Sequence, residues 1–312
     1  MITLKRHLTP GASLDLHSHS WHSDGTLAPC EVARRMVRAG VGVGALTDHD
    51  TLEGVPEFRR EAARHGLAVL SGVELTCACR ELLPLREAER ARRAGQAVPA
   101  EETGAPPGSP IEVHLLVYGL APGLPAFEDF LASIRAMRRE RVAGMLELLR
   151  GLGLALDASR LGERLRTGSV GRPHLARLLV EDGHARTVGE AFQRWLAEGR
   201  PAWLPKQLPE VREALDLARG LGGVAVVAHP GKVLPEGSAL ALVDLGVDGL
   251  EARHPSHRAA LVQELHELCR RNRLSASAGS DFHDPTQGRY RAPEWRRDWV
   301  GGRLQLLLDG LG

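Results

Sequence analysis

The stretch DLHSHSWHSD at residues 15–24 sets the framework for interpreting the rest of the chain. An apolar run that ends at Leu16 leads directly into His17 and His19, which are two positions apart. Residues i and i+2 of a β-strand point to the same side, so both imidazoles can reach one metal ion. Asp24 follows in the next loop as a third candidate ligand. Because a lone His-x-His pair is weak evidence, the prediction depends on recurrence elsewhere in the chain.

The arrangement does recur, because short apolar runs of strand length carry His, Asp or Glu at their ends. These runs lie at residues 41–47, 67–73, 112–118, 223–228, 247–250 and 274–278. On them or just beyond them stand His49, Glu74, His114, His229, Glu251, Asp281 and His283. In parallel α/β folds the carboxyl ends of the strands share one face, and active sites are built there. The recurrence therefore predicts a single site assembled from many strands.

Segments with helical periodicity lie between the apolar runs, at residues 30–39, 53–65, 209–221, 238–245 and 256–271. A repeated strand-then-helix order predicts parallel strands joined by crossover helices. Seven strands suit a barrel better than a short open sheet. We therefore expect an α/β fold of the TIM-barrel kind.

Two segments interrupt this order. Residues 80–110 begin as a charged helical run and end in a Gly- and Pro-rich loop, which predicts a flap. Residues 122–205 contain no convincing strand and favour helices at 127–152, 172–181 and 188–198. Residues 135–200 carry 13 Arg against 8 Asp and Glu, a local charge of +5. We expect a small helical domain at 122–205, inserted between barrel segments 1–121 and 206–312; the alternative is a set of additional barrel helices.

The types of ligand narrow the choice of metal. Imidazole mixed with carboxylate, without thiolate, suits Mn²⁺, Zn²⁺ or Fe²⁺ better than Ca²⁺ or Mg²⁺. One catalytic ion takes three to four protein ligands, so the nine candidates predict two or three ions, with a carboxylate such as Glu74 as a bridge. The candidates are His17, His19, Asp24, His49, Glu74, His114, His229, Asp281 and His283. Such a centre can hydrolyse a phosphate ester through a metal-bound hydroxide, with no other catalytic residue.

Composition excludes several other classes of protein. The 312 residues are 43% hydrophobic and 25% charged, which rules out a disordered or coiled-coil chain. A net charge of +1 and only 12 aromatic residues disfavour a nonspecific nucleic-acid-binding protein. The four cysteines are too few for a disulfide scaffold. Since neither a signal core nor a run of about 18 apolar residues occurs, we expect a cytoplasmic protein without a membrane partner.

Seven motifs together resemble the polymerase-and-histidinol-phosphatase (PHP) superfamily of metallophosphoesterases. They are DLHSHSWHSDGT (15–26), LTDHDTLEG (46–54), GVEL (72–75), EVHLLVYGL (112–120), VVAHPGK (226–232), DGLEARHPSH (248–257) and GSDFHDP (279–285). The resemblance implies a distorted (β/α)7 barrel with a di- or trinuclear metal site. It also implies that the same nine residues are the metal ligands. In this chain Glu74 and His114 lie 40 positions apart, because the 80–110 segment intervenes where the family has a short hairpin.

The segments at 138–154 and 171–205 resemble the helical insertion of one branch of this superfamily. Those enzymes remove a phosphate from 3′,5′-nucleoside bisphosphates, and some trim 5′-phosphorylated RNA in the 5′→3′ direction. The resemblance makes Arg172 and His174 candidates for gripping substrate phosphate; for Arg172 the alternative is a solvated residue at a helix start. Two further predictions concern neighbouring residues. We expect His254 and His257 to be weaker substrate contacts, and Asp48 and Asp50 to be acceptors that orient ligand imidazoles.

These observations predict a metal-dependent phosphoesterase that acts on small phosphorylated nucleotides and the 5′ ends of short RNA. The alternative among enzymes is a phosphatase of another small phosphomonoester, such as histidinol phosphate, which the insertion disfavours. A non-catalytic binding module would have lost ligand residues, and none of the nine positions has decayed. No obligate protein partner is evident from the sequence.

Overall fold

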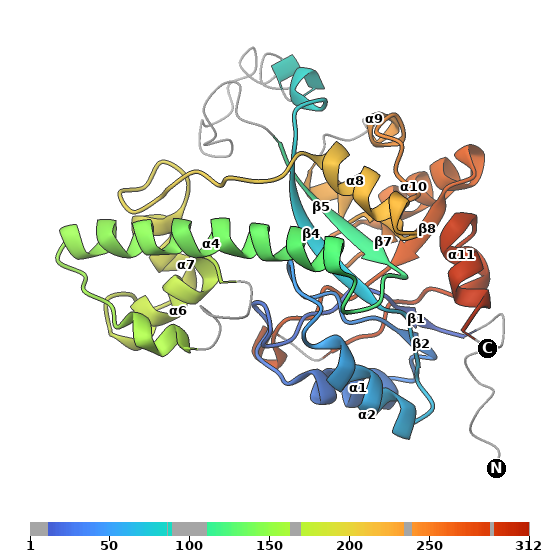
Figure 1. Cartoon of the computed structure of the whole chain (residues 1–312), viewed down its shortest axis with the longest axis horizontal. Coiled ribbons are helices and arrows are strands. Elements are labelled where there is room, and N and C mark those ends of the chain that lie inside the picture. Colours follow the sequence, from blue (N-terminus) through green and yellow to red (C-terminus); the bar gives the residue numbers. More distant parts are fainter. Residues whose placement is uncertain are drawn as a thin grey trace.

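The computed structural model describes residues 12–85, 87–88, 111–162, 170–233, 239–287 and 290–311. Its strands form two sheets (Figure 1). One sheet consists of β1 (Leu14–Asp15), β2 (Val43–Gly44) and β3 (Ala68–Val69). The other consists of β4 (Gly72–Cys79), β5 (Ile111–Tyr118), β6 (Val224–Val227), β7 (Gly249–Arg253) and β8 (Ser275–Ala278). The expected mixture of strands and helices is confirmed.

Most of the helices that follow the strands are short and amphipathic; the exception is the 27-residue helix Pro125–Gly151. In α1, for example, Val32, Ala33 and Met36 are buried, and the i, i+1, i+4 spacing makes one apolar face. Pro29 begins α1, where the lack of an N–H costs no hydrogen bond. The helices are α1 (Pro29–Arg38), α2 (Val55–Arg64), α4 (Pro125–Gly151), α6 (Arg172–Glu181), α7 (Val188–Ala191), α8 (Val211–Gly220), α9 (Leu240–Val243), α10 (Ala259–Asn272) and α11 (Gly302–Asp309).

The strand directions differ from the expectation of an all-parallel sheet. β1, β2 and β3 are parallel, as are β6, β7 and β8. β5 is antiparallel to both β4 and β6. The register of β4 with β5 runs from Gly72↔Tyr118 to Cys79↔Ile111, so the two strands form a hairpin that is joined by the 80–110 segment. Strands of a hairpin pair in the antiparallel sense, and the all-parallel prediction is therefore wrong at β5.

Isolated bridges link the two sheets. Residues beyond β2 reach β4 through the parallel bridge His49↔Glu74, and residues beyond β1 reach the end of β8 through Ser18↔Phe282. The two sheets are thus in contact on both sides, but the described residues do not form one closed ladder. Both bridges lie beside candidate metal ligands, so the junction of the sheets is also the location of the site.

The chain has a main core between the sheets and their helices and a separate core beyond them. Helix α4 extends from the sheets out to α6 and α7 (Figure 1). A second buried cluster lies there, and it includes Val142, Met145, Leu175, Leu179 and Trp195. Because these helices pack into a core of their own, they can hold their side chains firmly against the loops next to the two sheets.

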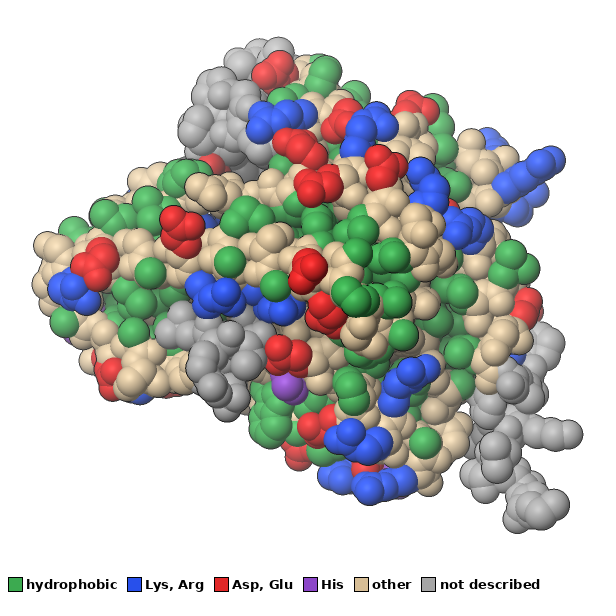
Figure 2. All heavy atoms as spheres, in the orientation of Figure 1, with side chains coloured by type: hydrophobic (Ala, Val, Ile, Leu, Met, Phe, Trp, Pro, Cys, Tyr) green, Lys and Arg blue, Asp and Glu red, His purple; other side chains and the backbone are tan. Residues whose placement is uncertain are grey.

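Two other expectations bear on the surface. The predicted 80–110 flap lies outside the described residues except for residues 80–85 and 87–88. On the face drawn in Figure 2, basic and acidic side chains are interspersed, in keeping with the net charge of +1. Among the described helices, none combines the length and apolarity that a membrane span requires.

Candidate metal centre

The nine residues predicted as ligands meet in one cluster at the ends of the strands. His17 and His19 follow β1, and both are fully buried. His49 follows β2, Glu74 and His114 lie in β4 and β5, and His229 follows β6, whereas Asp281 and His283 follow β8. Four overlapping groups have ligand atoms within 4.8 Å of one another: His19, Asp24, His49 and His283; His17, Glu74 and His229; His17, His19 and Asp281; and His49, Glu74 and His114.

Glu74 lies at the centre of the cluster and faces imidazoles with both oxygens. Its Oε2 is 3.2 Å from Nε2 of His17 and of His19, and 3.2 Å from Nδ1 of His49. Its Oε1 is 2.7 Å from Nδ1 of His114 and 3.1 Å from Nε2 of His229. A carboxylate placed between two sets of imidazoles has the geometry of a bridge between two ions.

Two aspartates complete the cluster on either side. Asp281 Oδ1 lies 3.3 Å from Nε2 of both His17 and His19, and these two nitrogens are 3.1 Å apart. Asp24 Oδ1 lies 3.1 Å from His283 Nε2, and its Oδ2 lies 3.8 Å from His49 Nε2. Ligands held tetrahedrally about 2.1 Å from an ion are about 3.4 Å apart. The shorter of these separations match that spacing.

Two features of the cluster suit divalent cations: it contains buried polar atoms without a hydrogen bond, and its donor atoms are of the types that such ions bind. Asp24 Oδ1, His49 Nδ1, Glu74 Oε2 and His229 Nδ1 are buried. Although a ring nitrogen or carboxylate oxygen lies 3.1–3.2 Å from each of the first three, none of the four makes a hydrogen bond of normal geometry among the described residues. Buried polar atoms are normally satisfied, and a cation would satisfy these four. The donors are imidazole nitrogens and carboxylate oxygens; Cys77 and Cys79 lie buried outside the groups. This donor set is the one that Mn²⁺, Zn²⁺ and Fe²⁺ accept.

Protonation differs among the residues of the cluster. Burial opposes protonation of His17, His19 and His114, but the surrounding carboxylates raise the pKa of His17, that of His19 to about 10 and that of His114 to about 9, so a divalent cation would displace a proton from these three rings. Burial lowers the pKa of His229 and, to well below its ordinary value, that of His49, so both rings are neutral with a lone pair available. Burial opposes ionisation of Glu74, but the nearby imidazoles of His49, His17 and His114 hold its pKa well below the usual range. The central carboxylate is therefore an anion at neutral pH.

Residues around the cluster hold its imidazoles in place. His17 Nδ1 is 3.0 Å from Glu251 Oε1, and Glu251 Oε2 accepts a hydrogen bond from the backbone N–H of His229 (2.7 Å). When Nδ1 of His17 carries the proton, the lone pair of Nε2 faces the cluster. On the other side Asp281 Oδ2 contacts His254 Nε2 (3.0 Å) and Lys232 Nζ (2.9 Å). Glu251 was identified from the sequence only as a strand-end carboxylate, and its role here needed the fold.

The residues predicted as orienting groups have other neighbours. Asp48 accepts hydrogen bonds from Ser20 and from Ser23 Oγ (2.6 Å), and it reaches His19 only through Ser23 Oγ, which is 3.4 Å from His19 Nδ1. Asp50 accepts hydrogen bonds from the Thr76 backbone N–H (3.0 Å) and from Arg138 Nε (2.6 Å). Both aspartates therefore organise loops around the site.

The two histidines predicted as weaker substrate contacts face inward. His254 lies against Asp281 and Ser256. His257 Nδ1 is 3.0 Å from the Ala252 carbonyl, and its Nε2 accepts a hydrogen bond from the Gly231 N–H (3.2 Å). His254 thus contacts a candidate ligand, and the ring of His257 lies 5.3 Å from that of His254.

Backbone strain is concentrated at the cluster. His229 (φ 30°), Asp281 (φ 49°) and Asp50 (φ 55°) occupy the left-handed region that side chains rarely adopt. Gly279 is required for a different reason, because a Cβ at this position would lie 2.1 Å from His17 Cβ. Such conformations persist where surrounding contacts determine them, which is typical of functional sites.

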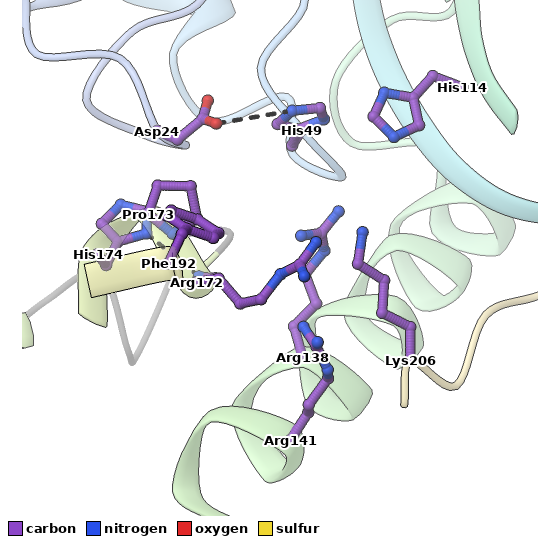
Figure 3. Close-up of a pocket in the computed structure, with 11 residues that line it drawn as sticks. Asp24, His49, His114, Arg138, Arg141, Arg172, Pro173, His174, Phe192 and Lys206 are labelled. Atoms are coloured by element: carbon purple, nitrogen blue, oxygen red, sulfur yellow. Dashed lines mark hydrogen bonds and ion pairs between the residues drawn. The ribbon is translucent and has the colours of Figure 1, made fainter. Parts of the chain in front are cut away.

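A cavity adjoins the cluster and has two unlike walls (Figure 3). Asp24, His49 and His114 form one wall. Four cations form the other: Arg138 and Arg141 from α4, Arg172 from the start of α6, and Lys206 from the segment that precedes α8. Figure 3 shows the charged ends of Arg138, Arg172 and Lys206 pointing toward the ligand wall.

The four cations carry more charge than their protein partners neutralise. Arg138 pairs with Asp50, and Lys206 pairs with Glu112. Arg141 donates from Nε to the Leu204 carbonyl (2.8 Å), and one of its terminal nitrogens is buried without a partner among the described residues. Burial lowers the pKa of Arg141 to about 10 and that of Lys206 to about 8, so both remain cations at neutral pH. This wall is suited to an anion.

Arg172 and His174, the predicted phosphate contacts, differ in their surroundings. Arg172 lies 5.6 Å from the centroid of the Phe192 ring, and one terminal nitrogen is 3.5 Å from the Leu196 carbonyl. His174 has both ring nitrogens engaged with backbone groups of Gly171 and Ser23. Arg138, Arg141 and Lys206 were missed from the sequence; the i, i+3 spacing of the two arginines on an Arg-rich helix was the available signal.

Comparisons with known proteins match most of the chain. A family model for the PHP domain matches residues 15–152. The 5′-3′ exoribonuclease Rnm of Salmonella typhimurium is 32% identical over 281 residues, which cover 87% of this chain and 85% of the relative. The 3′,5′-nucleoside bisphosphate phosphatase of Chromobacterium violaceum is 32% identical over 285 residues, which cover 89% of each chain.

Solved structures also match along most of the chain. An amidohydrolase from Chromobacterium violaceum, solved with bound sulfate and no metal, superposes with a TM-score of 0.75 at 29% identity and covers 96% of this chain and 97% of its own. A protein from Bifidobacterium adolescentis shares the fold, with a TM-score of 0.71 at 24% identity over 96% of this chain and 95% of its own.

Proposed function

This chain belongs to the PHP family of metal-dependent phosphoesterases, and from that premise we propose that it hydrolyses phosphomonoesters of nucleotides. The substrates that we propose are 3′,5′-nucleoside bisphosphates and, as a second class, the 5′ ends of short oligoribonucleotides. The relatives named as a nucleoside bisphosphate phosphatase and as a 5′-3′ exoribonuclease support both classes.

The observation that carries the proposal is the cavity with its ligand wall and its cation wall. A nucleoside with two phosphates can place the reacting phosphate against the ligand wall and the other against Arg138, Arg141, Arg172 and Lys206. A substrate with one phosphate leaves the cation wall unused. The remote phosphate thus contributes binding energy that positions the reacting one.

We propose that the clustered residues hold two or three divalent ions, with Mn²⁺ as the first choice and Zn²⁺ or Fe²⁺ as alternatives. Glu74 would bridge two of the ions, since its oxygens face different imidazoles. The ligands of each ion would come from the four overlapping groups: His19, Asp24, His49 and His283; His17, Glu74 and His229; His17, His19 and Asp281; and His49, Glu74 and His114. When bound, such ions supply Lewis acidity toward phosphoryl oxygens and activate a water molecule for attack.

The residues of the chain bind and orient the substrate. The buried terminal nitrogen of Arg141 can donate to a phosphate oxygen without first losing a protein partner. Arg172 can hold the same phosphate in a bidentate contact, because its planar guanidinium matches phosphate geometry. Glu251 keeps the His17 ring in one orientation throughout, through the contact at Nδ1.

Membership of the PHP family also suggests how the two sheets are arranged. We infer that β1, β2 and β4 to β8 together make the distorted seven-stranded ring of a PHP barrel; the two isolated bridges between the sheets support this inference. Residues 122–205 would be a helical domain inserted into that ring. The second buried cluster supports this assignment, since it lies between residues 142 and 202.

The experiment is a substrate panel with the purified, Mn²⁺-loaded enzyme. We expect kcat/KM to be highest for 3′,5′-bisphosphorylated nucleosides, lower for nucleoside 5′-monophosphates, and lowest for histidinol phosphate. A 5′-phosphorylated oligoribonucleotide should be shortened from its 5′ end, whereas a circular one should be left intact. A preference for histidinol phosphate, or cutting of circular and free-ended oligonucleotides at equal rates, would refute the proposal.

A further inference from the structure

We propose that α6 positions the loop that carries Asp24 through His174 and Arg177, and thereby sets the affinity of one metal site without setting that of the others. The inference rests on the proposed function, because it takes Asp24 as a metal ligand. It assigns His174 a positioning role in place of the phosphate contact expected from the sequence.

His174, a residue of α6, contacts the loop that carries Asp24. The side chain is only 3% exposed, and its Nε2 lies 2.9 Å from the Ser23 carbonyl. Its Nδ1 accepts a hydrogen bond from the backbone N–H of Gly171 (3.1 Å). Since Nδ1 is an acceptor, Nε2 carries the proton and donates to Ser23. The ring is thus held in one tautomer between two backbone segments.

Arg177 makes the neighbouring contact one helical turn later. One of its terminal nitrogens donates to the Asp24 carbonyl (2.8 Å). Residues three apart lie on the same helical face, so α6 presents both side chains to consecutive carbonyls of one loop. From within the barrel side, Ser23 Oγ donates to Asp48 (2.6 Å). The loop is therefore held at Ser23 by both His174 and Asp48, and at Asp24 by Arg177.

This support is specific to one part of the metal cluster. Asp24 belongs to the group with His19, His49 and His283, and it is not a member of the groups around Glu74. Arg177 holds Asp24 by its backbone carbonyl, and the side chain of the same residue places Oδ1 3.1 Å from Nε2 of His283. A shift of this loop would move Asp24 away from His283 while the strand that carries Glu74 stays in place.

The test measures metal binding directly, by equilibrium dialysis of the full-length protein against Mn²⁺ with elemental analysis. We expect His174→Ala and Arg177→Ala each to weaken one class of Mn²⁺ sites by roughly 10- to 100-fold, as residues that hold metal ligands do, and to leave the tighter class unchanged. His174→Gln, which keeps a donor near the Nε2 position, should restore much of the loss. Arg160→Ala is the matched control, because Arg160 pairs with Glu181 and Asp182 at the end of α6.

Thermal unfolding of each metal-free variant shows whether it is folded. If the buried His174→Ala variant fails to fold, Arg177→Ala decides the question, because Arg177 is partly exposed. Unchanged Mn²⁺ isotherms for folded variants, or equal weakening of every class, would overturn the inference. A wild-type chain that binds fewer than two ions would instead overturn the proposed multinuclear site, so the two failures can be told apart.

Discussion

Replacing Arg141 with methionine should reduce the preference for a second phosphate. Arg141 lies on the cation wall, and one of its terminal nitrogens is buried without a protein partner among the described residues. Methionine keeps much of the length of the side chain and removes the charge. The only protein hydrogen bond that the structure shows for Arg141, from Nε to the Leu204 carbonyl, costs about 1 kcal/mol of stability when lost.

The magnitude follows from the bond that the substrate would make. A hydrogen bond to a charged group contributes about 1.5–3 kcal/mol, and each 1.36 kcal/mol corresponds to about tenfold in rate. We therefore expect kcat/KM for a 3′,5′-nucleoside bisphosphate to fall by roughly 10- to 150-fold. The value for the 5′-monophosphate should change little, because that substrate has no second phosphate to lose.

The assay is phosphate release at a fixed Mn²⁺ concentration, with both substrates and with the metal content of each variant measured. Arg150→Met serves as the matched control, since Arg150 lies on the same helix and its side chain is 65% exposed beside Glu147. Arg141→Lys, which keeps the charge without the planar fork, should fall between the two. An equal loss for both substrates in Arg141→Met would refute the assignment of Arg141 to the remote phosphate.

Three further predictions concern the metals, the helical segment and pH. Purified wild-type protein should contain at least two transition-metal ions per chain by elemental analysis. Asp281→Ala or His17→Ala should abolish turnover and lower that metal content. One ion or fewer per wild-type chain, with no activation by added Mn²⁺, would contradict the multinuclear site. Arg172→Ala should lower kcat/KM for the bisphosphate by roughly tenfold or more with unchanged metal content, and unaltered steady-state kinetics would return Arg172 to a structural role. Burial lowers the pKa of Lys206 to about 8, so its positive charge is present below that pH and is lost as the pH rises through it. KM for the bisphosphate should therefore rise above pH about 8. A Lys206→Met variant should lack that rise.

The metal cluster could be predicted from sequence because its pattern is local. His17 and His19 stand two positions apart after an apolar run, and the same pattern recurs at Glu74, His229 and Asp281. Residues at the carboxyl ends of neighbouring strands must converge, so nine side chains could be placed together without coordinates. His114 joined them although 40 positions separate it from Glu74, because β4 and β5 pair as a hairpin across that segment.

The direction in which neighbouring strands pair could not be predicted from the local sequence pattern. Apolar periodicity identifies the run at 112–118 as a strand, but it does not state which way the strand lies beside its neighbours. β5 is antiparallel to both β4 and β6, its neighbours in the sheet. The all-parallel expectation therefore failed at β5.

The cation wall and the roles of the surrounding residues were decided by tertiary structure alone. Arg138 and Lys206 are 68 positions apart, and each looks like an ordinary charged residue in its own segment. They share a cavity because α4 leaves the sheets and the chain returns past it, which brings Lys206 to Glu112 of β5. His174 likewise has a donor and an acceptor like any other histidine, and its partner Ser23 lies 151 positions away. Local sequence determines which residues have the chemistry to bind metal or phosphate, whereas packing between distant segments determines which of them face a substrate and which hold another residue in place.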